Sequence, residues 1–263
     1  MRAMDIRAFS GKDGLVQMRA SFKKNWIHYL QESLGLAIFM VSACFFGGML
    51  EAKNASWHIA LPDASVRNLI MGAAMGFTAL LIFYSPFTAP SGSHINPSVT
   101  IVFFRLGKMC KWDSFFYIIF QCCGGIFAVY IMALLMGDTL KNAPVNYLTT
   151  VPGKYGVWPA AVVEFIIAFL MIAMVLFTSA DERWKKYTRI IAGCLVCAYV
   201  IIAGPISGFG MNPARSFASA VPAHIYTAFW IYMFIPFAGM LLAAELFLVV
   251  QKQNTRVDKI TMT

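Results

Sequence analysis

Charged residues are scarce in this sequence. Asp, Glu, Lys and Arg make up 13% of the 263 residues, whereas a soluble domain carries roughly 25%. Hydrophobic residues make up 59%, and the mean hydropathy is +0.68. This shortage of charge excludes an ordinary soluble domain and indicates a polytopic membrane protein.

Groups that carry enzymatic or metal chemistry are also few. The chain has four His and six Cys, and its apolar segments contain no nucleophile–base pair and no cluster of metal ligands. Cys194 and Cys197 have a spacing typical of metal sites, but no second pair or His cluster accompanies them. We therefore expect the cysteines to be small packing residues, with no metal, no cofactor and no enzymatic activity.

Six segments are long and apolar enough to cross a bilayer. A helix needs about 20 apolar residues to span the roughly 30 Å hydrocarbon layer. The segments lie at about 26–50, 66–86, 113–136, 157–180, 188–204 and 225–250. Short connections predict one domain over residues 26–250, between a basic N-terminal segment, 1–25, and a tail, 251–263. The first 25 residues are too polar to span and show no signal-peptide cleavage site.

Lys and Arg are distributed unevenly between the two sides of these spans. With a cytoplasmic N-terminus, 16 of the 21 fall on the cytoplasmic side and five on the other. Cytoplasmic connections of membrane proteins carry such an excess. The net charge of +9 is thereby explained without a nucleic acid partner. We expect a multi-pass protein of the cell (inner) membrane with both termini in the cytoplasm.

Two similar stretches occur at matching places in the chain. Residues 91–100 read SGSHINPSVT and residues 207–216 read SGFGMNPARS. Each follows the second span of a three-span half, which gives a first repeat at about 26–136 and a second at about 157–250. Because three is an odd number of spans, the second half must insert upside down, as an inverted repeat whose function lies near the bilayer midplane.

Each Asn-Pro pair predicts the start of a short helix. Asn is favoured at the N-cap and Pro at the first helical position. The apolar stretches from Asn96 to Gly107 and from Asn212 to Val221 contain 12 and 10 residues, or about 18 and 15 Å of helix. Each therefore spans half a membrane, and inverted symmetry brings the two starts together at the centre. A single copy would suggest an ordinary loop turn, but two matched copies favour half-helices.

These half-helices predict a polar site at the midplane. Their positive dipole ends point at the centre, and the amides of Asn96 and Asn212 would donate to a passing molecule. A water oxygen that accepts both hydrogen bonds turns its hydrogens outward, which interrupts a proton wire. Arg215, three residues into the second half-helix, is expected to face the path as a selectivity group rather than snorkel to the surface.

Four further polar residues lie in or beside these apolar stretches. We expect Glu32 and Glu164, one in the first helix of each half, to accept backbone hydrogen bonds from the motif loops; a proton relay is the alternative. His94 is either a hydrogen-bonded loop residue or a pH-sensitive gate. Gln121 is expected to form an interhelical hydrogen bond.

The paired motifs resemble the two signature loops of the aquaporin, or major intrinsic protein, family over about residues 26–250, and the first is similar to a bacterial branch. The resemblance implies an all-α fold of six tilted helices plus two half-helices, a homotetramer with one pore per subunit, and passive, cofactor-free transport. The second motif is the usual Asn212-Pro213-Ala214. The first is Asn96-Pro97-Ser98, with Ser where the family usually has Ala.

The resemblance also implies the positions of an outer constriction: Met75 (or Gly76), Val200, Phe209 and Arg215. Strict water channels usually have His at the position of Val200, and Phe209 resembles the aromatic residue of glycerol facilitators. Ser216, however, stands where those facilitators carry Asp. We expect a channel for water. The alternatives are a channel for glycerol or other small neutral solutes, such as hydrogen peroxide or ammonia, and a coupled secondary transporter with a carboxylate facing its pore.

Overall fold

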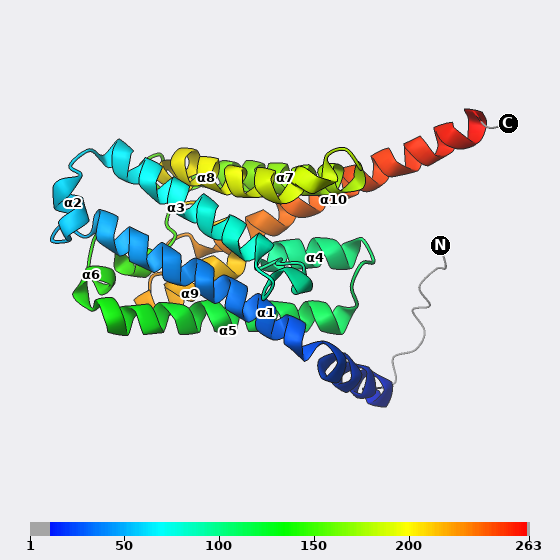
Figure 1. The fold of residues 1–263 in the computed structure, drawn as a ribbon, viewed down its shortest axis with the longest axis horizontal. Coiled ribbons are helices and arrows are strands. Elements are labelled where there is room, and N and C mark those ends of the chain that lie inside the picture. The colour runs from blue at the N-terminus through cyan, green and yellow to red at the C-terminus, as the bar shows by residue number, and fades with distance from the viewer. Residues whose placement is uncertain (1–10, 262–263) are drawn as a thin grey trace.

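The computed structural model describes residues 11–261, with side chains described for residues 14–253, and all the regular elements within that range are helices (Figure 1). Six helices among these described residues are long and apolar enough to cross a membrane. They are α1 (Gly11–Glu51), α3 (Ala64–Tyr84), α5 (Lys111–Met136), α7 (Val157–Ala180), α8 (Thr188–Ser207) and α10 (Phe229–Thr261). The expected all-α polytopic membrane fold is thereby confirmed.

Seven shorter helices complete the fold. Two of them, α4 (Pro97–Arg105) and α9 (Pro213–Ala223), follow the Asn-Pro pairs. Their 9 and 11 residues correspond to about 14 and 17 Å, so each reaches about halfway through a bilayer. The remaining five lie in the connections: α2 (Ser56–Ala60), η1 (Ala89–Ser91), α6 (Asp138–Lys141), η2 (Asn146–Leu148) and η3 (Lys185–Tyr187).

The packing of the long helices follows the expected inverted repeat. The first and third long helices of each half pack together, α1 against α5 and α7 against α10, while the two middle helices, α3 and α8, pack against each other. The half-helices α4 and α9 lie inside this frame, in contact with α5 and α10 and with each other. Figure 1 shows α4 at the end of the bundle where α1 begins and α10 ends, and α9 toward the opposite end.

Several helix ends differ from the sequence-based expectation. α1 begins at Gly11 rather than near residue 26, because the polar residues 11–25 continue the helix beyond its membrane-length part. α9 passes through Pro222 and ends at Ala223 rather than at Val221. Residues 1–10 of the expected N-terminal segment and residues 262–263 of the tail lie outside the described residues.

α8 extends beyond its expected end because of a contact from another helix. Pro205 lies inside α8 and has no N–H to donate to the carbonyl of Ile201, four residues earlier. The side-chain amide of Asn68 in α3 donates to that carbonyl instead, at 2.8 Å. With this carbonyl satisfied, α8 continues through the proline to Ser207.

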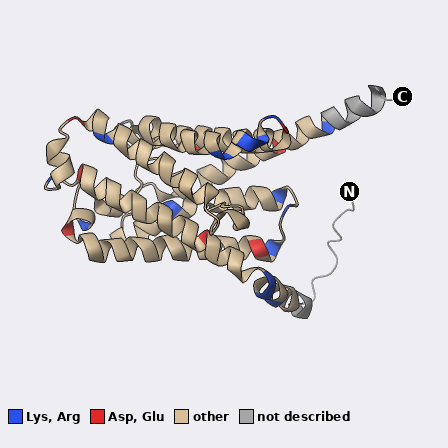
Figure 2. Ribbon diagram, viewed as in Figure 1, with Lys and Arg blue, Asp and Glu red and all other residues tan. Residues whose placement is uncertain are grey.

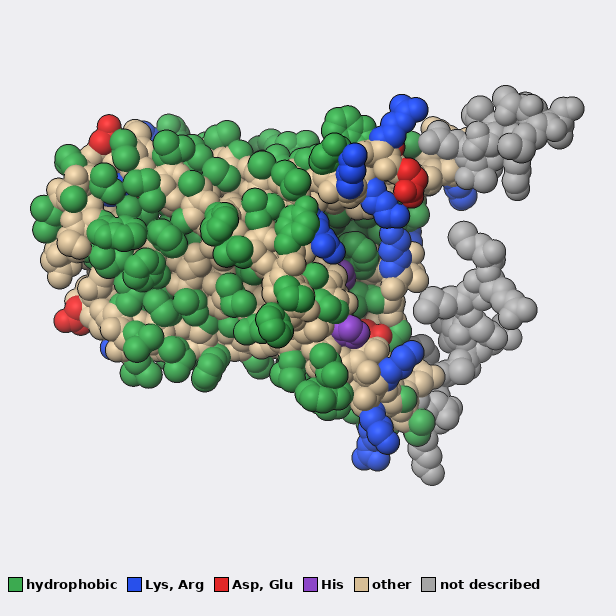
Figure 3. All heavy atoms as spheres, in the orientation of Figure 1, with side chains coloured by type: hydrophobic (Ala, Val, Ile, Leu, Met, Phe, Trp, Pro, Cys, Tyr) green, Lys and Arg blue, Asp and Glu red, His purple; other side chains and the backbone are tan. Residues whose placement is uncertain are grey.

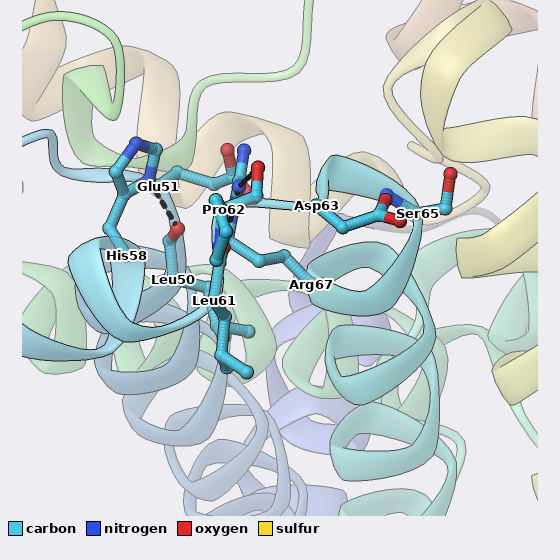
Figure 4. A network of polar contacts seen from close by, with 8 residues as sticks. All are labelled: Leu50, Glu51, His58, Leu61, Pro62, Asp63, Ser65 and Arg67. Carbon is cyan, nitrogen blue, oxygen red and sulfur yellow. Dashed lines mark hydrogen bonds and ion pairs between the residues drawn. The ribbon is translucent and has the colours of Figure 1, made fainter.

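The connection between α1 and α3 is fastened by one arginine. Arg67 donates from Nη1 to the carbonyls of Leu61 and Pro62, both at 2.9 Å, and its Nε lies 3.4 Å from a carboxylate oxygen of Glu51 (Figure 4). Arg67 is buried although it begins a membrane helix. It therefore holds the end of α1, this connection and the start of α3 together.

The surface is divided as a membrane protein requires. Figure 3 shows hydrophobic side chains over the length of the bundle. Lys and Arg gather at the end where α1 begins and α10 ends, and few lie at the opposite end (Figure 2). Exposed aliphatic and aromatic side chains on the long helices include Phe77, Phe127, Leu134 and Phe234. These side chains suit contact with lipid.

Candidate functional site

The two Asn-Pro pairs begin the half-helices in the expected way. The side-chain oxygen of Asn96 accepts a hydrogen bond from the N–H of Ser98 at 2.8 Å. That of Asn212 accepts from the N–H groups of Ala214 and Arg215, at 3.1 and 3.2 Å. In both helices the proline that follows the asparagine occupies the first turn. Each asparagine is therefore an N-cap; Asn96 is buried and Asn212 is partly buried.

The asparagine amides also join the two motif loops. Asn96 donates from Nδ2 to the carbonyl of Met211 at 3.0 Å, and Asn212 donates to the carbonyl of Ile95 at 2.7 Å. The sequence had suggested amides wholly free for a passing molecule. Since an amide nitrogen carries two N–H groups, one is used to join the loops and one remains for the cavity that both asparagines line.

Glu32 holds the first motif loop from α1. Its carboxylate is fully buried and accepts hydrogen bonds from the N–H groups of His94 and Ile95, at 2.9 and 2.6 Å. The hydroxyl of Ser91 and the side-chain amide of Gln121 also donate to it, at 2.6 and 2.8 Å. Ile95 has φ 42°, a region that β-branched residues rarely adopt. The bonds to Glu32 stabilise this unusual backbone.

Glu164 holds the second loop from α7 in the same manner. It accepts hydrogen bonds from the hydroxyl of Ser207 at 2.6 Å, from the N–H of Gly210 at 2.7 Å and from the N–H of Met211. Glu164 is also fully buried, and neither it nor Glu32 is among the residues that line the two cavities described below. Both carboxylates are bonded to loop backbone, an arrangement that gives no support to a proton relay or to a coupled transporter.

Two cavities lie on either side of the motif loops. The cavity at the end of the bundle where α1 begins and α10 ends is called the inner cavity below, and the other is called the outer cavity. The inner cavity, of about 510 Å³, is lined by His94, Asn96 and Asn212 and extends to Lys186 and Arg189 at the connection between α7 and α8. The outer cavity, of about 440 Å³, is lined on the other side by residues of α1, α3, α8 and the α6–α7 connection. Phe209 and Arg215 line both cavities. These two side chains therefore stand at the boundary between them.

The expected constriction residues come together at the outer cavity. Met75, Val200, Phe209 and Arg215 all line it. Gly76, the alternative to Met75, faces α8 instead: a Cβ added there would lie 2.7 Å from the Cβ of Cys197 and 2.9 Å from the carbonyl of Gly193. The geometry thus favours Met75 over Gly76 as the α3 residue of the constriction.

Arg215 is buried and held by neutral acceptors. Its Nη1 donates to the carbonyl of Leu148 at 3.0 Å and to the hydroxyl oxygen of Thr150. The hydroxyls of Thr150 and Ser216 are 3.1 Å apart. Among residues 14–253, no carboxylate forms an ion pair with Arg215. The guanidinium of Arg215 is therefore held without direct contact with a carboxylate. Sequence analysis did not identify Leu148 or Thr150, because no pattern marks the segment between α6 and α7.

His94 and Gln121 form polar contacts on the inner side. His94 Nδ1 lies 3.3 Å from the hydroxyl of Thr100, and its ring centroid is 4.5 Å from that of Phe103. Gln121 Nε2 donates to Glu32 and, at 3.2 Å, to the same Thr100 hydroxyl. Gln121 thus joins α5 to α1 and α4, as expected of an interhelical hydrogen-bonding residue. His94 is hydrogen-bonded and also lines the inner cavity.

Six spans, two capped half-helices and a lined path between them define a membrane channel built from an inverted repeat. A model of the family described as Major intrinsic protein matches residues 19–247. The chain belongs to the major intrinsic protein family, whose aquaporin and aquaglyceroporin members are channels for water or small neutral solutes rather than enzymes.

Several relatives support this assignment. The chain is 33% identical over 222 residues to Aquaporin TIP2-3 of Arabidopsis thaliana, which covers 83% of this chain and 85% of the relative. It is 38% identical over 156 residues to a probable NIP-type aquaporin of Nicotiana alata, covering 59% of this chain and 56% of that one. With Aquaporin NIP1-4 of Oryza sativa subsp. japonica, the identity is 31% and the coverage 64% and 60%. These relatives are plant proteins, which corrects the expected likeness to a bacterial branch.

A solved structure shares the fold. The X-ray structure of the aquaglyceroporin from Plasmodium falciparum superimposes with a TM-score of 0.68 and 18% sequence identity, over 84% of this chain and 94% of that chain. At this level of identity, the likeness shows a common arrangement of helices and half-helices.

Proposed function

We propose that this chain is a passive channel for water that excludes protons and ions. The proposal rests chiefly on Asn96 and Asn212, which cap two opposed half-helices and line one cavity while each retains an unused amide N–H. Passive transport needs no chemical step, and the two glutamates inside the bundle are bonded to loop backbone.

The geometry provides a physical route to exclusion of protons. A water molecule at the midplane accepts hydrogen bonds from both amides, so its own hydrogens point away along the path and the chain of water molecules changes direction there. Two half-helix N-termini with positive dipole ends repel cations at the same point. The unpaired charge of Arg215 repels them again at the boundary of the outer cavity.

Small neutral solutes such as glycerol are the second candidate permeants, with hydrogen peroxide and ammonia in the same class. The observation that favours them is the apolar character of Met75, Val200 and Phe209 around the outer cavity. Arg215 is the polar member of this group, so the carbon skeleton of a small solute would contact an apolar wall while its hydroxyls bond to the guanidinium.

We further propose that the protein is a homotetramer in the cell membrane, with the start of α1 and the end of α10 in the cytoplasm. The orientation rests on the gathering of Lys and Arg at that end (Figure 2). The proposal of a tetramer rests on the resemblance to the family. It is tested by measuring the mass of the protein in detergent and correcting for bound detergent.

Stopped-flow light scattering of reconstituted liposomes tests the permeant. An inward gradient of an impermeant sugar reports water flux, and an inward gradient of glycerol reports solute flux. Shrinkage much faster than in empty liposomes, without fast re-swelling in glycerol, would support a water-selective pore. Fast re-swelling would assign the protein to the solute channels, and no acceleration under either gradient would contradict both proposals.

A further inference from the structure

The inner cavity has a strongly basic mouth. The connection between α7 and α8, including the first turn of α8, contains four cationic residues, and three of them line the cavity: Lys185, Lys186 and Arg189. The fourth, Arg183, does not. Membrane orientation requires cations on this side of the bilayer, but it does not require their side chains to line a cavity. Their placement therefore calls for a separate explanation.

The charges of two of these side chains are not neutralised by carboxylates. Lys186 lies over the ring of Tyr187, 4.9 Å from its centroid, and Arg189 lies over the ring of Tyr84, at 5.4 Å. Within residues 14–253, neither of them forms an ion pair. A guanidinium or ammonium group that lies over an aromatic ring keeps the N–H donors that point away from the ring available to another ligand.

Lys185 has a partner, but a weak one. Its Nζ lies 3.3 Å from Glu182, and the two side chains are 61% and 89% exposed. An ion pair this exposed contributes about 0–1 kcal/mol, so an incoming anion competes with it easily.

The start of α8 adds to the same field. Arg189 is in its first turn, and no side chain caps that helix end. The positive dipole end of this 20-residue helix favours anions. Ser179 and Thr188 also line the cavity there, although the Thr188 hydroxyl is engaged with Thr178 at 2.8 Å.

We propose that Lys185, Lys186 and Arg189 form a binding site for a phosphate group, and that an occupied site obstructs the inner end of the pore. Lys and Arg side chains together suit a phosphate, because both donate charge-assisted hydrogen bonds to its oxygens. The anion cannot pass from this cavity through the pore, since transfer of a permanent charge through the apolar bundle is too costly. It would therefore stay in the cavity through which water must pass. The obstruction rests on the proposed channel function, but the binding does not.

Phosphorus-31 magnetic resonance tests the binding directly. The full chain in a phosphorus-free detergent is titrated into sodium phosphate at constant ionic strength, and the line width of the phosphate signal is recorded. We expect saturable broadening with the native chain. For the double variant Lys186→Gln, Arg189→Gln we expect at least about tenfold weaker binding, since two charge-assisted hydrogen bonds are lost.

Two further variants distinguish the site from nonspecific attraction. Arg183→Gln removes a cation from the same connection but not from the cavity, and it should bind phosphate like the native chain. Arg189→Lys keeps the charge, and it should bind at least threefold more tightly than the double variant. Equal weakening by Arg183→Gln, or no saturable broadening with the native chain, would overturn the site. Circular dichroism checks that each variant is folded.

Water flux tests the obstruction. Liposomes of neutral lipid with phosphate on both sides should conduct water at least twofold more slowly than those with chloride at equal ionic strength, and this ratio should approach one in the double variant. Binding without a change in the ratio would overturn the obstruction but not the site. Native liposomes without water flux in chloride would contradict the channel, whereas the resonance result would still decide the site.

A final arm separates two sources of phosphate groups. Liposomes rich in phosphatidylglycerol, without free phosphate, present the group on a lipid. Slower flux there, in the native chain but not in the double variant, would assign the site to a lipid headgroup. Slower flux with free phosphate alone would assign it to a soluble phosphate.

Discussion

The first and second motif loops share one backbone frame. Each contains three residues of positive φ, at positions that correspond with an offset of 116 residues. These pairs are Gly92 and Gly208, Ser93 and Phe209, and Ile95 and Met211. Each loop is bonded to one buried glutamate, and each receives a tyrosine hydroxyl on the carbonyl of its first serine, at 2.8 Å in both cases. The frame is therefore duplicated almost bond for bond.

The loops differ in the side chains that they direct at the path. At the same offset, Val99 in the first loop corresponds to Arg215 in the second, and His94 corresponds to Gly210. The guanidinium thus stands at the boundary between the two cavities, and the imidazole lines the inner cavity. What the repeat preserves is the support of the two half-helices, and what it varies is the side chains that line the cavities.

The largest effect is expected from removing the support of one loop. Glu164→Ala leaves the buried N–H groups of Gly210 and Met211 without an acceptor, and it leaves the hydroxyl of Ser207 only the carbonyl of Ala203, at 3.3 Å. Each unsatisfied donor costs about 1–3 kcal/mol, so we expect about 2 kcal/mol or more of destabilisation and loss of water flux. Thermal unfolding in detergent measures the first and stopped-flow scattering the second.

The shared frame implies that Glu32→Ala should be damaging to a similar degree. The amide of Gln121 would also lose one of its two partners and keep only the hydroxyl of Thr100. A Glu32→Ala variant with native stability would show that the two loops are not held equivalently.

The next largest effect concerns the residue that the two loops do not share. Arg215→Ala removes a buried charge and several donors from the boundary between the cavities. We expect glycerol or urea flux to rise about tenfold or more, because about 1.4 kcal/mol of lost discrimination corresponds to a factor of ten. Val99→Ala, at the matching position of the first loop, is the control and should leave solute exclusion as it is. Native exclusion in Arg215→Ala would remove Arg215 from the constriction.

Thr150 should have a smaller effect through the same arginine. Thr150→Val removes one acceptor of Arg215 Nη1 and leaves the carbonyl of Leu148. The guanidinium would then be less firmly held, and we expect a two- to fivefold rise in urea flux, consistent with the roughly 0.5–1.5 kcal/mol of one hydrogen bond. Thr150→Ser keeps the hydroxyl and should restore native exclusion. Native urea exclusion in Thr150→Val would mean that the hydroxyl of Thr150 is not needed to hold Arg215.

Val200→His changes the same constriction from the α8 side. An imidazole adds a donor and bulk to the apolar wall of the outer cavity. We expect any glycerol flux to fall while water flux stays within about twofold of native, on the principle that lining donors and pore diameter set selectivity. Glycerol re-swelling measured beside sugar-induced shrinkage tests this. Unchanged glycerol flux would mean that Val200 lies outside the constriction.

The features that depend on residues close together in the sequence were predicted well. Hydropathy located all six spans, and the fourth agrees with α7 at both ends. The half-helices followed from Asn-Pro chemistry, because an N-cap and a first-turn proline act within a few residues of themselves. Glu32 and Glu164 were expected to accept loop backbone because isolated carboxylates in apolar helices need hydrogen-bond donors.

The features that depend on distant contacts were missed. The fifth span was expected to end at about residue 204, and the bond from the amide of Asn68 in α3 to the carbonyl of Ile201, which supports the helix through Pro205, could not be predicted. Hydropathy falls before residue 26 although helix α1 does not end there. The bond from Asn96 to the carbonyl of Met211 and the contact of Thr150 with Arg215 join segments far apart in sequence. No local pattern reports such pairings.

The smallest effect is expected at the position where the residues of the two motifs differ by a single oxygen atom. Ser98 occupies the position of Ala214, and its hydroxyl is buried with no hydrogen-bond partner among the described residues. Ser98→Ala removes an unsatisfied polar group, which should stabilise the protein by up to about 1 kcal/mol and leave water flux native. The reverse change, Ala214→Ser, introduces such a group into the second loop and should destabilise by about 1–3 kcal/mol. Thermal unfolding of the two variants compares them directly. A loss of stability in Ser98→Ala would mean that this hydroxyl has a partner, such as a buried water. The two loops would then differ in their support as well as in the side chains that line the cavities.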